Sequence, residues 1–156
     1  MLNRRELLAD SARVAARVAA LLAAGGLLPQ AAHAAYQAAA FEAKSMAELM
    51  KALGASAPAE SKDVTITGPD IAENGAVVPV GASTSLAGAK RIALLVEKNP
   101  AMLAAIFDIT EAVEPNISTR VKMGQSSNVI AVVFTADNKV LFAQKEIKVT
   151  LGGCGG

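Results

Sequence analysis

The residue with the most reactive side chain in this sequence occurs once, close to the end of the chain. Cys154 lies between two glycine pairs, Gly152-Gly153 and Gly155-Gly156, which close the sequence. Glycine loses the most conformational entropy on ordering and has no side chain to pack, so this segment predicts a mobile arm rather than a strand. Fully extended, such an arm reaches about 17 Å. The pattern indicates a thiol that carries a covalently attached group and can enter a narrow channel.

Nothing near Cys154 in the sequence activates its thiol. The nearest cation is Lys148, whereas the terminal carboxylate lies only two residues away. A neighbouring negative charge disfavours the thiolate, which is the reactive form. We therefore expect Cys154 to react slowly alone and to be activated inside the active sites of partners.

Two other interpretations of the cysteine are open. It could be incidental in a disordered tail, or it could form an intermolecular disulfide. An exposed free thiol is a liability in an oxidising compartment, which disfavours the incidental interpretation. As the only cysteine, Cys154 excludes an internal disulfide and a CxxC redox pair.

The first 34 residues are typical of an export signal. Arg4 and Arg5 precede a short apolar run, Val18 to Leu28, and an A-x-A cleavage site ends at Ala34. The run is too short to span a membrane as a helix. The arginine pair resembles a twin-arginine signal, which we favour over general secretion. The alternative is a retained amphipathic N-terminal helix.

Processing would change the chemistry that the chain can perform. Cleavage after Ala34 removes His33, which is the only histidine. The mature chain then lacks the base of a Ser-His-Asp or Cys-His site and any histidine metal ligand, so we expect no metal site. Acid/base chemistry by carboxylates alone stays open, but the acidic residues are scattered and no pair has a distinctive setting. Loss of four of the 15 basic and two of the 14 acidic residues leaves a net charge of −1. Without a basic cluster, nucleic-acid binding is excluded.

The segment 35–54 predicts an N-terminal helix. It is rich in good helix formers, Ser45 to Glu48 fits a capping box, and Gly54 fits a helix stop. Met46, Leu49, Met50 and Leu53 give one apolar face at helical spacing. We expect this face to pack on the protein's own domain; the alternative is that it binds a partner.

After a short linker, the segment 62–151 predicts an all-β immunoglobulin-like sandwich. Seven or eight short apolar or alternating runs are separated by turn signals such as Asn74-Gly75 and Asp137-Asn138. Pro79 within one run predicts an edge strand or a bulge. Met102 and Met123 are expected to fill the core. The expected strands are 64–67, 76–80, 91–96, 103–109, 118–123, 128–135, 140–142 and 145–151.

Taken together, these features resemble the SoxY family, the sulfur-carrier subunits of the bacterial periplasmic sulfur-oxidising (Sox) system. The resemblance covers essentially the mature chain, and its main motif is the terminal Gly-Gly-Cys-Gly-Gly at 152–156. At Ala101-Met102 the sequence departs from the Asn-Pro pair that the family would lead us to expect. The supporting stretches are 70–75, 78–80, 97–100, 120–122, 128–131 and 145–149.

The resemblance implies a periplasmic carrier that is not itself an enzyme and holds no cofactor. Cys154 would receive thiosulfate through a c-type cytochrome and give a cysteine S-thiosulfonate. A metal-dependent hydrolase would release sulfate and leave a persulfide, whose outer sulfur a molybdenum-haem sulfane dehydrogenase would oxidise. The resemblance also implies a heterodimer with a small β-sandwich subunit, SoxZ, that is exported together with this chain.

Two rival functions use other chemistry. Small carrier proteins that end in Gly-Gly form a thiocarboxylate at the terminal carboxylate, and Gly155-Gly156 matches that ending. That reaction needs ATP, and the export signal places the chain where ATP is absent. A non-covalent β-sandwich binding module is the second rival, because such folds host many functions.

Overall fold

The computed structural model describes residues 38–151. The predicted export signal with Arg4, Arg5 and Ala34 lies outside the described residues, as does the arm with Cys154. The helices are α2 (Ala38–Glu42) and α3 (Met46–Ala52). The strands are β1 (Ala59–Glu60), β2 (Val64–Thr67), β3 (Ile71–Asn74), β4 (Val78–Thr84), β5 (Ala89–Val96), β6 (Leu103–Asp108), β7 (Asn116–Val121), β8 (Ser127–Thr135) and β9 (Val140–Leu151).

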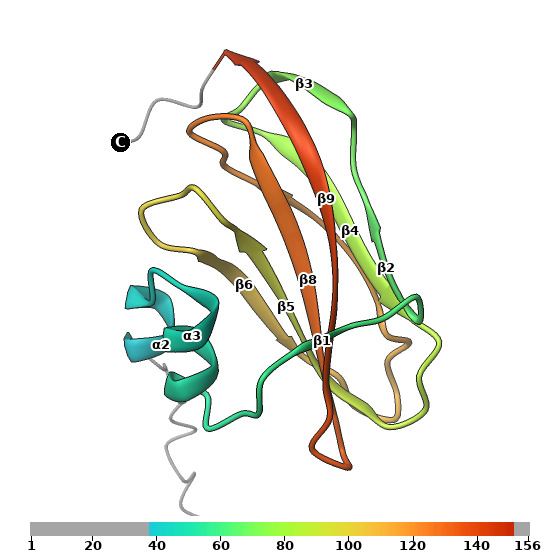
Figure 1. Cartoon of the computed structure of the whole chain (residues 1–156). Helices are drawn as coiled ribbons and strands as arrows, with labels where there is room; N and C mark the ends of the chain where they lie inside the picture. The colour runs from blue at the N-terminus through green and yellow to red at the C-terminus, as the bar shows by residue number, and fades with distance from the viewer. Residues whose placement is uncertain (1–37, 152–156) are drawn as a thin grey trace, which may run out of the picture. The chain divides into compact units, whose positions relative to one another are not determined.

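The strands form two sheets, which confirms the predicted all-β sandwich (Figure 1). The larger sheet has the order β1-β9-β8-β5-β6, and β3 also pairs with β9. The smaller sheet has the order β2-β4-β7. Every pairing is antiparallel except those of β1 and β3, which run parallel to β9.

Two apolar clusters hold these layers together. One lies between the sheets and includes Met123, which is fully buried. The other includes Met102 and lies between the larger sheet and the helices. The central strands β5 and β8 contribute to both clusters, so both of their faces are covered, and this explains their nearly continuous apolar sequences. Both methionines fill the core, as predicted.

The N-terminal helical segment consists of two short helices rather than the single helix expected. The second has the predicted cap: the Ser45 hydroxyl accepts from the Glu48 N–H at 3.2 Å. The Glu48 carboxylate accepts from the N–H of Lys44, one residue before the usual partner in a capping box. Gly54 has a φ of +64° and ends α3, with the Ala55 N–H donating to the Met50 carbonyl.

The apolar face of α3 packs on the domain, as predicted. Leu49 and Met50 are buried in the cluster beneath the helices, and Met46 and Leu53 pack against it. Because these side chains pack on the protein's own domain, the alternative that this face binds a partner is excluded.

Pro79 lies in a different setting from the one predicted. It belongs to β4, the central strand of the smaller sheet, and pairs with Arg120 of β7. The neighbouring β2 ends at Thr67, which is opposite Gly81. Pro79 therefore lies beyond the end of the β2 ladder, where its missing N–H interrupts no bond to that strand.

Candidate functional site

The predicted arm, residues 152–156, directly follows β9 in the sequence. This strand runs from the β8–β9 turn to Leu151, the residue before Gly152 (Figure 1). Along most of its length β9 pairs with β8, and the last pair joins Ser127 and Ile147. The final residues of β9 thus extend beyond the neighbouring strand and need other partners.

The strand β3 supplies those partners on one side. It runs parallel to the end of β9, with Ile71 opposite Lys148 and Asn74 opposite Leu151. The ladder begins where the Lys148 N–H donates to the carbonyl of Asp70 at 3.0 Å. The Thr150 hydroxyl adds a side-chain bond to the carbonyl of Glu73 at 3.1 Å.

Gly75 makes the last described contact before the arm. Its N–H donates to the Leu151 carbonyl at 2.8 Å, and its own carbonyl accepts from the Met123 N–H at 2.7 Å. Met123 is fully buried and Gly75 is buried. Two consecutive hydrogen bonds therefore connect the protein core to the peptide that joins Leu151 to Gly152.

Ser126 supplies the partner on the other side of β9. Ser126 precedes the first residue of β8, and its side chain bonds to β9 where β8 no longer pairs with that strand. The Ser126 hydroxyl accepts from the Val149 N–H at 2.9 Å and lies 3.5 Å from the Val149 carbonyl as a donor. One hydroxyl thus serves both backbone groups of Val149.

An ion pair joins the start of β3 to β9. The Lys145 ammonium lies 2.8 Å from the Asp70 carboxylate, and hydrogen bonding to this lysine lowers the pKa of Asp70. The Asp70 side chain is 90% exposed, so the pair contributes little to stability.

The end of the sandwich near the arm also exposes apolar side chains. Leu151 is 71% exposed, and Val77 and Ile71 are also exposed. Ala72 of β3 is opposite Val149 of β9; Ala72 lies in the core cluster and Val149 packs against it. Because successive side chains in a strand point to opposite faces, Ile71 lies on the face away from the core.

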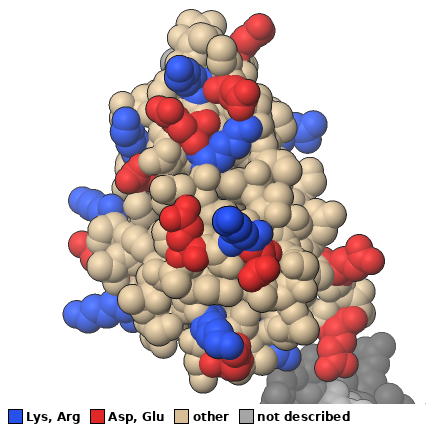
Figure 2. All heavy atoms as spheres, turned by 45° about the vertical axis from the view of Figure 1, so that its right-hand side comes forward, with Lys and Arg blue, Asp and Glu red and all other residues tan. Residues whose placement is uncertain are grey.

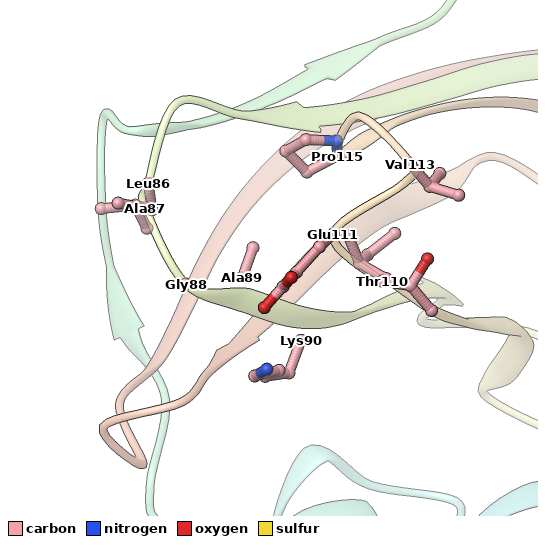
Figure 3. Close-up of a pocket in the computed structure, with 10 residues that line it drawn as sticks. Leu86, Ala87, Gly88, Ala89, Lys90, Thr110, Glu111, Val113 and Pro115 are labelled. Atoms are coloured by element: carbon pink, nitrogen blue, oxygen red, sulfur yellow. The ribbon is translucent and has the colours of Figure 1, made fainter.

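A separate hollow of about 370 Å³ lies at the opposite end of the sandwich (Figure 3). It is lined by the β4–β5 and β6–β7 loops, with Lys90, Glu111 and Val113 at its exposed edge. The Ala136 N–H donates to the Gly88 carbonyl, which places the hollow beside the β8–β9 turn. No residue of this hollow belongs to the predicted site.

The charges on the face seen in Figure 2 are mixed, with acidic and basic side chains interspersed. Within residues 38–151, no group of three or more His, Cys, Asp or Glu residues could hold a metal ion. No helix in this part of the chain is long and apolar enough to cross a membrane.

The sequence predicts an arm at 152–156, which lies outside the described residues, but it does not single out the residues that hold the end of β9. Gly75 was assigned only to a turn, and neither Ser126 nor Thr150 was singled out. The segment before the Asn74-Gly75 turn shows no strand pattern, and its pairing with β9 joins residues about 77 positions apart.

Comparison with known proteins gives the class of this fold and site. The family model described as "Sulfur oxidation protein SoxY" matches residues 49–154, which include Cys154. The solved sulfur carrier protein SoxY from Chlorobium limicola f thiosulfatophilum is 37% identical, with a TM-score of 0.58. The match covers 69% of this chain and 100% of that one. None of the curated proteins compared with the chain matches it.

A second solved structure shares only the fold. The superoxide reductase (neelaredoxin) from Ignicoccus hospitalis is 20% identical, with a TM-score of 0.50. The match covers 55% of this chain and 78% of that one. The fold and the family match together define a β-sandwich protein of the sulfur-carrier class. The chain belongs to the SoxY family.

Proposed function

We propose that this protein carries sulfur intermediates of thiosulfate oxidation as covalent adducts of Cys154. The observation that carries the proposal is the family match, which extends to Cys154 itself. Glycine on both sides of the cysteine supports a mobile arm, consisting of Gly152, Gly153, Gly155 and Gly156 around the thiol.

The proposed cycle begins with an oxidation. The Cys154 thiol and thiosulfate form an S–S bond, the thiol proton is released, and two electrons pass to a c-type cytochrome. Water then attacks the terminal sulfonate sulfur in a metal-dependent hydrolase. Sulfate and a proton leave, and a persulfide remains on Cys154.

The outer sulfur of the persulfide is then oxidised and also released as sulfate. A sulfane dehydrogenase removes six electrons from the outer sulfur of the persulfide and adds three oxygen atoms from three water molecules. A second hydrolysis releases sulfate and restores the thiol. Every electron transfer and hydrolysis takes place on a partner, so this chain is a carrier without a cofactor of its own.

The proposed assembly has two parts. A small β-sandwich subunit of the SoxZ type forms a heterodimer with this chain, and the Sox enzymes bind in turn. The pair works in the periplasm, which it reaches through the twin-arginine signal at Arg4 and Arg5. Deletion of both arginines should leave both subunits in the cytoplasm. Export of the partner without this chain would refute shared export.

Intact mass spectrometry tests the carrier function. Protein purified from cells that are oxidising thiosulfate should gain the mass of a thiosulfate or sulfane unit, located on Cys154 by peptide mapping and removed by a reductant. A thiocarboxylate at Gly156 would support the rival Gly-Gly carrier chemistry. Unmodified protein under these conditions would support a non-covalent binding module.

A further inference from the structure

We propose that Asn74 is a site of covalent modification, where the side-chain amide is converted through a succinimide to aspartate or isoaspartate. Asn74-Gly75 is the only Asn-Gly pair in the sequence. In this reaction the backbone nitrogen of the following residue attacks the side-chain carbonyl carbon, and glycine, which has no Cβ, hinders that attack least. The reaction needs no group of the predicted arm, so it is independent of the proposed carrier function.

The structure prepares the electrophile of this reaction. The Asn74 side chain is exposed, and its oxygen Oδ1 accepts a hydrogen bond from the Ala76 N–H at 2.9 Å. Attack on the carbon Cγ places negative charge on Oδ1, so a donor that already points at this oxygen lowers the barrier. Water also has access to this exposed side chain for the later hydrolysis.

The structure at the same time restrains the nucleophile. Gly75 is buried, and its N–H donates to the Leu151 carbonyl at 2.8 Å. The Gly75 nitrogen must lose this proton before it attacks, and a neutral carbonyl accepts the hydrogen bond without taking the proton. The Gly75 carbonyl accepts from the Met123 N–H at 2.7 Å, which fixes the glycine further. The site is therefore closed while the bond between Gly75 and Leu151 is made.

The end of β9 controls when the site opens. Leu151 is the last residue of this strand and is 71% exposed. Pairing with β8 ends at Ile147, so beyond that point β3 is the neighbouring strand, with Asn74 opposite Leu151. The ends of strands separate from their neighbours more readily than their centres. The rate of modification should therefore follow the fraction of molecules in which the Gly75 N–H is released.

The reaction balances with water as the only co-reactant. Hydroxide removes the Gly75 amide proton, the nitrogen forms a bond to Asn74 Cγ, the bond from Cγ to Nδ2 breaks, and ammonia leaves. Water then opens the succinimide. Cleavage between nitrogen and Cγ gives aspartate, whereas cleavage of the original peptide bond gives isoaspartate, whose backbone runs through Cβ and Cγ. This longer path moves Gly75 relative to Leu151 and Met123, so the site does not close again.

The test compares the natural chain with three full-length variants. Leu151→Gly removes an exposed side chain and makes the end of β9 more costly to order, so the Gly75 bond should open more often. Gln144→Gly is the matched control, because it makes the same kind of change at an exposed position in the middle of β9. Asn74→Gln removes the site, since its longer side chain would have to close a six-membered ring.

The first measurement is peptide mapping by mass spectrometry after incubation at mildly alkaline pH, with isoaspartate separated from aspartate. Conversion at Asn74 should be several-fold slower in the folded chain than in urea. Leu151→Gly should accelerate it in the folded state by about 2- to 5-fold, and Gln144→Gly by less. Asn138, which is exposed and followed by Lys139, is an internal control that should convert more slowly in urea. Absence of conversion at Asn74 in both the folded natural chain and Leu151→Gly would overturn the proposal.

The second measurement is hydrogen exchange at the Gly75 amide, followed in the same variants and at urea concentrations below the unfolding transition. Exchange at Gly75 and conversion at Asn74 should rise by the same factor, because both need this N–H to be released from Leu151. Conversion that accelerates while Gly75 stays protected would refute control by the end of β9. Neither measurement involves Cys154, so a failure of the carrier function would leave both results intact.

Discussion

The N–H of Gly75 donates to the carbonyl of Leu151 at 2.8 Å, and this bond ties the last described residue to the turn after β3. Because the Gly75 carbonyl also accepts from the N–H of the buried Met123, two backbone hydrogen bonds connect the end of β9 to the core. Contacts between residues distant in the sequence thus hold the end of β9, which precedes the predicted arm.

Replacement of Cys154 by serine should abolish thiosulfate-dependent sulfate formation. The substitution removes the sulfur that forms the adduct but touches no contact of residues 38–151 described above. Thermal unfolding and binding to the partner subunit should therefore match the natural chain. Residual sulfate formation well above background would contradict the carrier function.

Deletion of residues 152–156 should have the same effect on activity. A truncated chain ending at Leu151 keeps the Gly75 bond and the β3 ladder, so its circular dichroism and unfolding transition should be unchanged. A marked loss of stability would show that the terminal residues contribute to the fold.

The Asp137 carboxyl, in the turn between β8 and β9, should titrate well below its usual range. Hydrogen bonds from Lys139 and then Thr135 lower the pKa of Asp137 from 3.8 to about 2. Because the pKa of Asp137 is lower in the folded state than in the unfolded state, its ionised carboxylate stabilises the fold at pH values above 3.8. This contribution is lost as the pH falls from 3.8 through about 2. NMR titration should give a midpoint near 2, and Lys139→Ala should raise it towards 3.8. An unchanged midpoint in that variant would assign the shift to another cause.

Gly81→Ala should destabilise the protein by about 1–3 kcal/mol, the usual cost of overpacking. A Cβ at this position would lie 2.5 Å from Thr67 Oγ1 and 3.1 Å from the Ile117 carbonyl. The added variant Thr67→Ala should restore part of the loss. Gly124→Ala is the matched control, since its Cβ would meet nothing within 4 Å, and chemical denaturation should find it near neutral.

Leu49→Ala should lower the free energy of unfolding by about 2–5 kcal/mol, because it leaves a cavity beneath α3. Leu49 is fully buried in the cluster between the helices and the larger sheet. Val77→Ala, at a side chain that is 53% exposed, should cost less than about 0.5 kcal/mol. Similar losses in both variants, measured by urea denaturation, would contradict this account of the core.

Local patterns predicted much of this fold. Ser45 and Gly54 marked the ends of α3 because capping depends on neighbouring residues, and the apolar runs of β5 and β8 marked the core strands. β3 was missed because only Ala72 among its residues is buried, so it lacks an alternating pattern. The parallel pairing of β3 with β9 depends on contacts between residues that are far apart in the sequence. The same is true of the hydrogen bonds between Val149 and Ser126.

The placement of β9 also has a mechanical consequence. In the proposed function, a partner that draws Cys154 inward would apply force to the end of a strand that is held along its length by β8 and near its end by β3. A pull along the strand axis loads these ladders in shear, so many bonds resist together, because they lie across the strands. The arrangement of β8, β9 and β3 therefore suits a strand whose end is loaded along its axis.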